Sequence, residues 1–255
     1  MRFKEQLVAR PGDEAKTPAE KKVLILSWLK KNNFHNCIVN DDGEVDSPTS
    51  IDLGMMRFKA SSYAGLKSVL PKFGTIHGSF DASTIGATEL LGWCPHTVTE
   101  ACNLNNNHLS DLRGAPNTVN GKFDVAHNEL STFEGAPRLV DAFAASGNNL
   151  SSFEGCTPDI GMYLDIRENK FKSLKDINKH VKKLDGFLAI SGNDITSHVM
   201  GVFLIEGLTS LQFNRGDQRW AEIVNDHLSL PDRNPAIIEC QHLLIEAGYE
   251  ELAQI

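Results

Sequence analysis

The stretch Phe123-Asp-Val-Ala-His-Asn128-Glu-Leu130-Ser-Thr-Phe133-Glu-Gly135-Ala-Pro137 decides the fold, because the chain repeats it. The next copy reads Phe143-Ala-Ala-Ser-Gly-Asn148-Asn-Leu150-Ser-Ser-Phe153-Glu-Gly155-Cys-Thr-Pro158. A copy precedes these two from Cys102, a copy follows from Leu164, and weaker copies start at Phe80 and Leu188. The starting residues 80, 102, 123, 143, 164 and 188 lie 22, 21, 20, 21 and 24 residues apart. The chain is therefore expected to be a stack of similar coils.

Each copy opens with apolar residues that alternate with polar ones, which predicts a short strand with one buried face. Such strands are too short to fold alone, so copies stacked ~4.8 Å apart are expected to form one parallel sheet over a continuous core. The pattern apolar–x–apolar–x–x–Asn–x–apolar at this period is typical of leucine-rich repeats. The predicted fold class is thus an α/β solenoid: a short leucine-rich-repeat parallel sheet of six strands, with an α/β N-terminal cap and a helical C-terminal cap.

An asparagine recurs where each coil must bend inward after its strand. The bend leaves backbone groups inside the molecule, and an amide side chain can both donate to and accept from them. The first copy differs, because Ile85 stands at this position, as is common in a terminal repeat. A Gly-x-Pro sequence in three copies, the third of which is lengthened by one residue because Thr157 displaces its proline, predicts an extended return path rather than a helix. The predicted asparagine ladder comprises Asn107, Asn128, Asn148, Asn169 and Asn193.

The repeat divides the chain into an N-terminal cap at residues 1–77, repeats at 78–200 and a C-terminal cap at 201–255. Thr17, Pro18 and Glu20 form a capping-box pattern that predicts a helix start, and Asn32 with Asn33 predicts its end. The apolar face of this helix is expected to contain Val23, Leu24, Leu26, Trp28 and Leu29. The run Asn40-Asp-Asp-Gly43 between short apolar segments predicts a hairpin turn.

The last segment is expected to be helical. Asp217 can cap one helix, with Trp220, Ile223, Val224 and Leu228 on its buried side, and Asn234-Pro235 is expected to begin a second that ends before Gly248. Covering the last repeat is the favoured role for both helices. An amphipathic helix that docks onto a partner would have the same sequence pattern and remains an alternative.

The chain of 255 residues carries 25 Lys and Arg against 33 Asp and Glu, a net charge of −8. This balance argues against nucleic acid and against anionic membranes as partners. An apolar content of 41% is typical of a folded soluble domain. We expect neither a signal peptide nor a membrane span. Five cysteines without framework spacing favour reduced thiols in a cytoplasm.

Three segments resemble a family of small leucine-rich-repeat proteins of tailed bacteriophages: Gly43–Asp46 with Leu70–Asp81, the repeated Gly-Ala-Pro unit, and the ending Ile237–Ala253. The resemblance covers roughly residues 35–255 and implies a phage product in the cytoplasm of an infected bacterial host. Most members have no assigned function, so it supplies no catalytic residues. The copy around Asn169 departs from the pattern by lacking Gly-x-Pro, and His198 stands where an apolar residue usually closes the last unit.

Few residue sets suggest chemistry. Cys94, His96, Cys102 and His108 could form a zinc site, but in repeat register Cys102 takes a core position and His108 a surface position. Asp41, Asp42, Glu44 and Asp46 could bind a cation, although they lack calcium-loop spacing. Cys240 has no basic neighbour in sequence that would activate it as a nucleophile. The sequence therefore predicts no metal, no cofactor and no enzymatic activity.

The remaining candidate surface is the solvent face of the sheet. Its middle carries small residues, whereas Tyr and Arg, which are typical interface anchors, gather toward the C-terminal end. The predicted function is binding of a protein, from the host or the phage, in order to inhibit or redirect a host or defence factor. The alternative functions are a phage assembly protein and an enzyme that uses Asp124 and Asp165. The alternative for the surface itself is that Phe187 packs under the last helices and the other residues are only solvated. The predicted contact residues are Lys122, Asp124, Tyr163, Asp165, Arg167 and Phe187.

Overall fold

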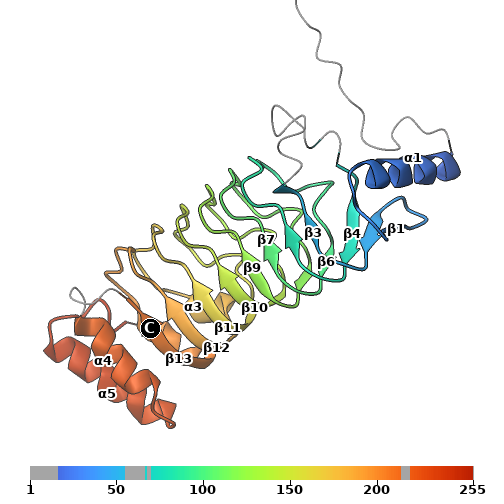
Figure 1. The fold of residues 1–255 in the computed structure, drawn as a ribbon. Helices are drawn as coiled ribbons and strands as arrows, with labels where there is room; N and C mark the ends of the chain where they lie inside the picture. The colour runs from blue at the N-terminus through green and yellow to red at the C-terminus, as the bar shows by residue number, and fades with distance from the viewer. Residues whose placement is uncertain (1–16, 55–66, 68–69, 214–218, 255) are drawn as a thin grey trace, which may run out of the picture.

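The protein is represented by a computed structural model, which describes residues 17–54, 67, 70–213 and 219–254. The chain winds into stacked coils that form an elongated β-solenoid (Figure 1). The predicted parallel sheet of stacked coils is thereby confirmed.

The main sheet has eight parallel strands in the order β13-β12-β11-β10-β9-β7-β5-β3. The six predicted repeat starts stand in one register, each paired with its equivalent in the next coil. Two strands were not predicted, because β3 lies within the predicted N-terminal cap and β13 within the predicted helical tail. The strands are β3 (Ile51–Asp52), β5 (Phe80–Asp81), β7 (Cys102–Asn103), β9 (Lys122–Asp124), β10 (Leu139–Ala144), β11 (Asp159–Asp165), β12 (Lys183–Ala189) and β13 (Glu206–Gln212).

A second, smaller sheet lies on the return side of the N-terminal coils, in the order β1-β2-β4-β6-β8. Its pairs are parallel except β1 with β2. In the later coils β10, β11 and β12 are longer strands of the main sheet, which pair over both their first and their last residues. The proline-containing segments therefore lead into extended backbone, as predicted. The strands are β1 (Ile38–Val39), β2 (Val45–Ser47), β4 (Phe73–Ile76), β6 (Thr97–Val98) and β8 (Thr118–Val119).

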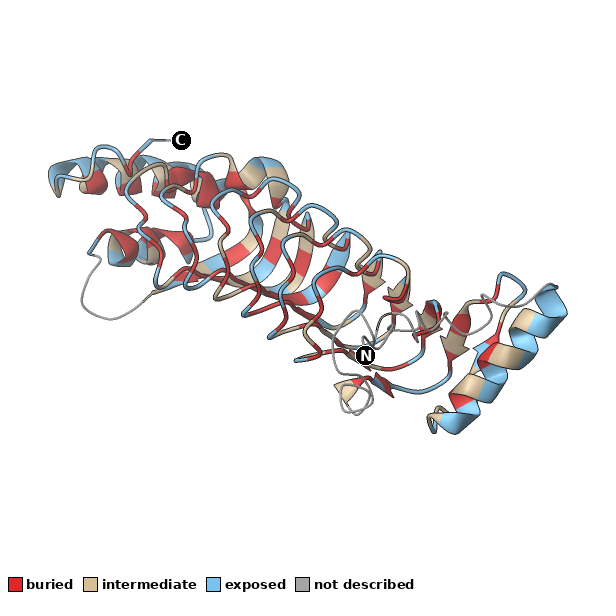
Figure 2. Cartoon of the chain, turned by 90° about the horizontal axis from the view of Figure 1, so that it is seen from above, coloured by how far each residue is buried: buried red, intermediate tan, exposed pale blue. Residues whose placement is uncertain are grey.

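One hydrophobic core runs the length of the solenoid (Figure 2). Each strand contributes its alternate, inward residues, so equivalent side chains of successive coils stack. The Phe123 and Phe143 rings lie 5.3 Å apart between centroids, and Phe133 meets Phe143 edge-on at 5.6 Å. Aromatic pairs at these distances stabilise a core beyond the area that they bury.

The asparagine side chains connect neighbouring coils inside the bend. The Asn148 amide nitrogen donates to the carbonyl oxygens of Val125 and Ala145, both at 3.1 Å, and its oxygen accepts from the Leu130 N–H at 3.0 Å. The same three bonds recur at each position of the column, so buried backbone groups of two coils are paired in every case. The column consists of Asn107, Asn128, Asn148, Asn169 and Asn193.

Helix α1 (Pro18–Lys31) begins with the predicted capping box between Thr17 and Glu20 and ends before Asn32, which confirms both signals. Its buried face is narrower than predicted. Ile25 and Leu29 are buried, whereas Val23 and Leu26 are exposed, because only one side of the helix packs on the coils.

The predicted hairpin turn joins β1 and β2. The Asn40 side chain closes it by accepting hydrogen bonds from the backbone N–H groups of Asp42 and Glu44.

The C-terminal segment is less helical than predicted. A 3-10 helix, η2 (Met200–Leu204), and strand β13 precede helices α4 (Arg219–Leu228) and α5 (Arg233–Glu246). The predicted start of α5 at Asn234-Pro235 is wrong: the Asp232 carboxylate caps the helix through the Asn234 N–H, so the proline lies within the first turn. The predicted cap Asp217 lies outside the described residues. Helix α5 ends before Gly248, which has positive φ, as predicted.

Helix α4 closes the outer edge of β13 with a side chain. The Asn225 amide accepts from the Leu211 N–H at 2.6 Å and donates to the Leu211 carbonyl oxygen at 2.9 Å. A further strand would offer the same two bonds to this residue. The guanidinium of Arg233 donates to the Leu208 carbonyl oxygen on the same strand. These side chains occupy the backbone groups that an edge strand leaves open.

Candidate functional site

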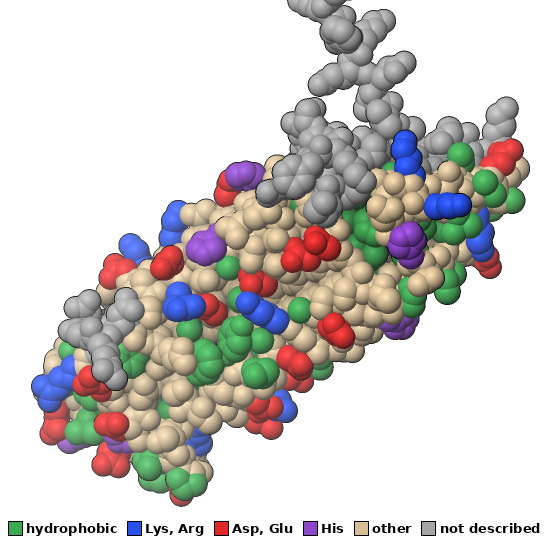
Figure 3. Space-filling model, viewed as in Figure 1, with side chains coloured by type: hydrophobic (Ala, Val, Ile, Leu, Met, Phe, Trp, Pro, Cys, Tyr) green, Lys and Arg blue, Asp and Glu red, His purple; other side chains and the backbone are tan. Residues whose placement is uncertain are grey.

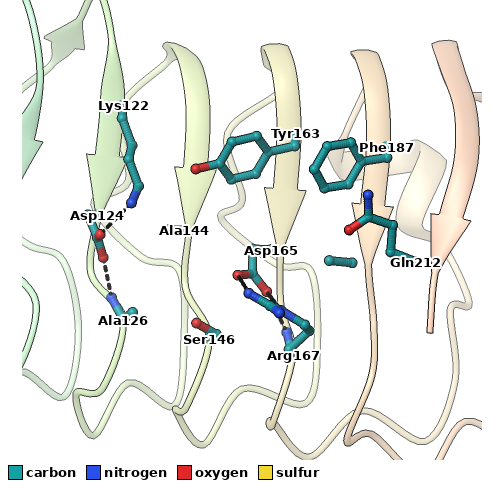
Figure 4. Close-up of a pocket in the computed structure, with 11 residues that line it drawn as sticks. Lys122, Asp124, Ala126, Ala144, Ser146, Tyr163, Asp165, Arg167, Phe187 and Gln212 are labelled. Carbon is teal, nitrogen blue, oxygen red and sulfur yellow. Dashed lines mark hydrogen bonds and ion pairs between the residues drawn. The ribbon is translucent and has the colours of Figure 1, made fainter. Parts of the chain in front are cut away.

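The open face of the main sheet holds a hollow of about 290 Å³ between β9 and β13 (Figure 4). In the space-filling view, hydrophobic atoms over these strands are bordered by acidic and basic side chains (Figure 3). The six residues predicted as a contact patch all line the hollow, so the structure brings them together. The lining residues are Lys122, Asp124, Ala126, Ala144, Ser146, Tyr163, Asp165, Arg167, Phe187, Ala189 and Gln212.

The hollow follows from the register of the strands. Equivalent positions form rows across the sheet, and alanine at 142, 144 and 189 leaves space between larger neighbours. Tyr163 and Phe187 stand side by side in one row, while Asp124 and Asp165 lie in the next row with Ala144 between them. Because neighbouring strands lie ~4.8 Å apart, the backbones of Asp124 and Asp165, two strands apart, are separated by roughly 10 Å across the sheet.

The Tyr163 and Phe187 rings form a stacked pair, with centroids 5.2 Å apart and planes 10° from parallel. Figure 4 shows both rings over β11 and β12, with the Tyr163 hydroxyl directed toward β9. Both side chains remain partly exposed at the hollow. The structure therefore places Phe187 on the open face, where its ring packs on Tyr163.

Two ion pairs flank the aromatic rings. The Arg167 guanidinium binds the Asp165 carboxylate through two bonds, of 2.7 and 2.9 Å, and the Lys122 ammonium lies 2.7 Å from an Asp124 oxygen. Hydrogen bonding and the charge of Asp165 raise the pKa of Arg167. Burial alone would lower the pKa of Lys122, but its bond to Asp124 raises it overall. Arg167 keeps 52% of its side chain exposed, so it remains available to a ligand.

The carboxylates of Asp124 and Asp165 also accept hydrogen bonds from backbone N–H groups two residues later. Asp124 accepts from the Ala126 N–H at 3.0 Å and Asp165 from the Arg167 N–H at 3.1 Å, which is an Asx turn. The same turn recurs in the earlier coils at Asp52, Asp81 and Asn103. Asp or Asn at positions 52, 81, 103, 124 and 165 was a readable signal for this turn, which sequence reasoning missed, although Ala144 and Ala189 take the same position in their coils.

Two lining residues, Ser146 and Gln212, were absent from the predicted patch. Ser146 lies two residues after Ala144, and Arg167 lies two residues after Asp165, so the two residues take equivalent positions in neighbouring coils. Gln212 was missed together with strand β13. The apolar–x–apolar unit Leu211-Gln-Phe213, which starts 23 residues after Leu188, was the signal that could have found it.

The residues of the alternative zinc site do not converge, because the two cysteines lie together in the core and the two histidines lie at the surface. Cys94 and Cys102 are buried, and burial raises the pKa of the Cys94 thiol. The His96 ring bonds Glu44 at 3.2 Å and the His108 ring bonds Glu129 at 2.8 Å, both at the surface. Over residues 17–54, 67, 70–213 and 219–254, no group of three His, Cys, Asp or Glu side chains could hold a metal ion.

The candidate nucleophile Cys240 and two of the candidate cation-binding carboxylates, Glu44 and Asp46, have structural roles. Cys240 is buried, which raises the pKa of its thiol to about 12, far from a reactive thiolate. Of the turn carboxylates, Glu44 pairs with Lys72, and Asp46 accepts from the Thr75 N–H.

Comparison with known proteins yields no relative: no family model matches the chain, and no curated protein or solved structure matches it. Within the described part of the chain, each helix is too short or too polar to cross a bilayer.

Proposed function

We propose that the chain is a non-enzymatic protein-binding module, and that the hollow on the open face is the centre of its contact surface. The observation that carries this proposal is the stacked, partly exposed pair Tyr163–Phe187 beside Arg167. Aromatic and arginine side chains dominate binding energy at protein interfaces, and pre-stacked rings lose little conformational freedom on binding. The alternative of a carboxylate enzyme has less support, because Asp124 and Asp165 are each held by a cation and a backbone amide.

The same proposal identifies the coils as leucine-rich repeats between two caps. The period of 20 to 24 residues and the asparagine column support the repeat class. Helix α1 with the β1–β2 hairpin stands at one end of the stack and helices α4 and α5 at the other, where Asn225 bonds the last strand. Solenoids need such segments because a bare end exposes the core.

The proposed partner is a bacterial host or defence protein, bound in the cytoplasm of an infected cell. Support for this comes from the resemblance to leucine-rich-repeat proteins of tailed phages. Binding would act by surface complementarity, with no covalent step. A phage assembly protein would use the same surface, so the identity of the captured protein decides between the two.

Affinity capture from phage-infected bacteria tests the proposal. The tagged chain is compared with the double variant Arg167→Ala/Phe187→Ala and with a matched control, Arg138→Ala/Leu139→Ala, which removes an exposed arginine and an exposed apolar side chain elsewhere. We expect the first variant to lose the partner at a nearly unchanged melting temperature and the control to keep it. A captured host protein supports inhibition, and a virion protein supports assembly. If the Arg167→Ala/Phe187→Ala variant captures the partner as well as the control variant does, the proposed contact surface is refuted.

A further inference from the structure

We propose that the hollow also binds a single ring of a neutral carbohydrate. This inference goes beyond the protein partner proposed above and does not depend on it. Three features of the hollow point to a sugar: balanced charge with mixed donors and acceptors, an aromatic platform, and a floor in which the N–H groups of Val125, Ala145 and Ile166 are paired within the sheet.

The polar groups around the hollow are mixed and neutral in sum. Lys122 and Arg167 face Asp124 and Asp165 at hydrogen-bonding distance, so each positive charge is matched by a negative one. The Lys122 ammonium and the Arg167 guanidinium retain N–H groups beyond those in the ion pairs, and the carboxylates retain lone pairs. The Ser146 hydroxyl and the Gln212 amide can each donate and accept. A ligand with several hydroxyl groups, each both donor and acceptor, matches this lining.

The aromatic pair supplies the apolar contact that a sugar ring needs. A pyranose carries its C–H groups on its faces and its hydroxyl groups around its rim. The Tyr163 and Phe187 rings lie nearly parallel over neighbouring strands, while Asp165 and Arg167 lie farther along the chain from Tyr163 and Gln212 lies on β13 (Figure 4). A ring placed against the aromatic pair therefore directs its rim toward Arg167, Asp165 and Gln212. The volume of about 290 Å³ lies at the lower end for small-ligand sites, which suits one ring rather than a long chain.

The floor of the hollow disfavours two other ligand classes. The backbone N–H groups of Val125, Ala145 and Ile166 donate to the next strand within the sheet. They cannot cradle a phosphate, nor can they pair with an added peptide strand, as an open sheet edge would. Because both cations are paired with carboxylates, an anion beside them would also face those two negative charges. A neutral, hydroxyl-rich ligand needs neither a free backbone N–H group nor an unpaired cation.

Titration of the purified chain, followed by NMR shifts of its backbone amides, tests the proposal. The probes are methyl hexosides, N-acetylhexosaminides and their linear oligosaccharides, with inorganic phosphate as the anionic comparison. We expect at least one saccharide to shift amides of residues 122–126, 144–146 and 163–167, and phosphate not to do so. Tighter binding of oligosaccharides would identify a ring within a polymer, whereas equal binding would identify a free sugar.

Variants make the test specific. Phe187→Ala and Arg167→Ala are each expected to weaken saccharide binding at least tenfold. Ser146→Trp fills the hollow without removing an ion pair and should abolish binding, and Arg138→Ala/Leu139→Ala should leave it unchanged. The proposal is overturned if no saccharide in the panel binds, if phosphate binds in their place, or if Ser146→Trp binds normally. Protein capture is measured on the same variants, so failure of one activity is distinguishable from failure of the other.

Discussion

In both the central coils and the C-terminal end, an asparagine side chain pairs with backbone N–H and carbonyl groups, but the two regions use this pairing differently. In the centre, Asn148 bonds backbone groups of its own coil and of the coil before it, and so joins two repeats. At the end, Asn225 of a helix bonds both backbone groups of Leu211 and takes the place of a further strand. An amide can thus extend a stack or stop it, depending on whether it comes from the next coil or from outside the sheet.

The two regions also differ in regularity, and this difference bears on function. The strand pairs β9–β10 and β11–β12 keep a constant register, whereas β12 and β13 shift register twice where they pair. Tyr163 and Phe187 belong to the regular β11–β12 pair, which places their rings side by side. The regular coils therefore carry the side chains that we propose contact a partner, and the irregular pair lies beyond them at the C-terminal end.

The largest effect is expected from breaking the asparagine column. Asn148→Ala leaves the buried Leu130 N–H without a partner and removes one of the two amide donors to each of the Val125 and Ala145 carbonyl oxygens. It should lower the free energy of unfolding by about 4 kcal/mol, since an unpaired buried N–H costs about 1–3 kcal/mol and each lost hydrogen bond about 1 kcal/mol. The neighbouring Asn149→Ala makes the same chemical change at a half-buried side chain and serves as the control. Urea unfolding measures both. A difference below about 1 kcal/mol between the two variants would show that the column is not what joins the coils.

Glycines sharpen the same comparison. Gly135 has a φ of +91°, and a Cβ there would overlap the Leu112 carbonyl of the preceding coil. Gly248, after the last helix, has a similar φ of +83° but open space around it. We expect Gly135→Ala to cost about 3 kcal/mol, from strain and coil separation, and Gly248→Ala about 1 kcal/mol, from the left-handed backbone alone. Equal costs from thermal unfolding would mean that the coils adjust freely to one another.

Removing the amide that closes the sheet should change association more than stability. Asn225→Ala exposes the N–H and carbonyl groups of Leu211, which a strand of another molecule can pair with. We expect a stability loss of about 2 kcal/mol and concentration-dependent oligomers in analytical ultracentrifugation. Asn234→Ala, at an exposed position of the next helix, is the control. A variant that stays in the same oligomeric state as the unaltered chain would refute the edge-closing role.

The smallest expected effect concerns pH at the N-terminal end. Burial would raise the pKa of Glu44, but Lys72 and His96 lower it overall, below its ordinary value of 4.5. A carboxylate with a lowered pKa stabilises the fold above its unfolded value and loses that contribution as the pH falls through the folded value. Glu44→Gln should therefore cost less than about 1 kcal/mol at pH 7 and progressively less as the pH falls below 4.5 toward 3. Melting temperatures across this pH range, with Glu154→Gln as an exposed control, check this.

The regular part of the fold was predictable from the sequence. Periodic apolar residues and the asparagine at each bend determine which strands pair and in which register, so the six repeat starts align by their spacing and flanking residues. The flanking strands β3 and β13 escaped prediction because their coils lack the asparagine bend, and because Ile51 lies 29 residues before Phe80, outside the repeat period. The start of α5 was misplaced because Asp232 and Asn234 are both good caps.

The candidate site was predictable in composition but not in shape. Strand alternation showed which side chains face outward, and this placed Tyr163, Arg167 and Phe187 on one surface. The stacking of the two rings, the ion pairs and the hollow depend on side-chain conformations and on the small residues between them, which a one-dimensional pattern does not contain. The turn-forming role of Asp124 and Asp165 depends likewise on backbone geometry after each strand.

Photo-crosslinking tests the central claim most directly. A photo-reactive phenylalanine analogue is placed at Phe187 on the open face in one variant, and at Ile238, which is 70% exposed on helix α5, in another. Both are illuminated in infected cells. The open-face account predicts one dominant covalent adduct with a protein partner from position 187 and none from position 238. An adduct from position 238 alone would contradict the account and assign partner binding to the C-terminal helices.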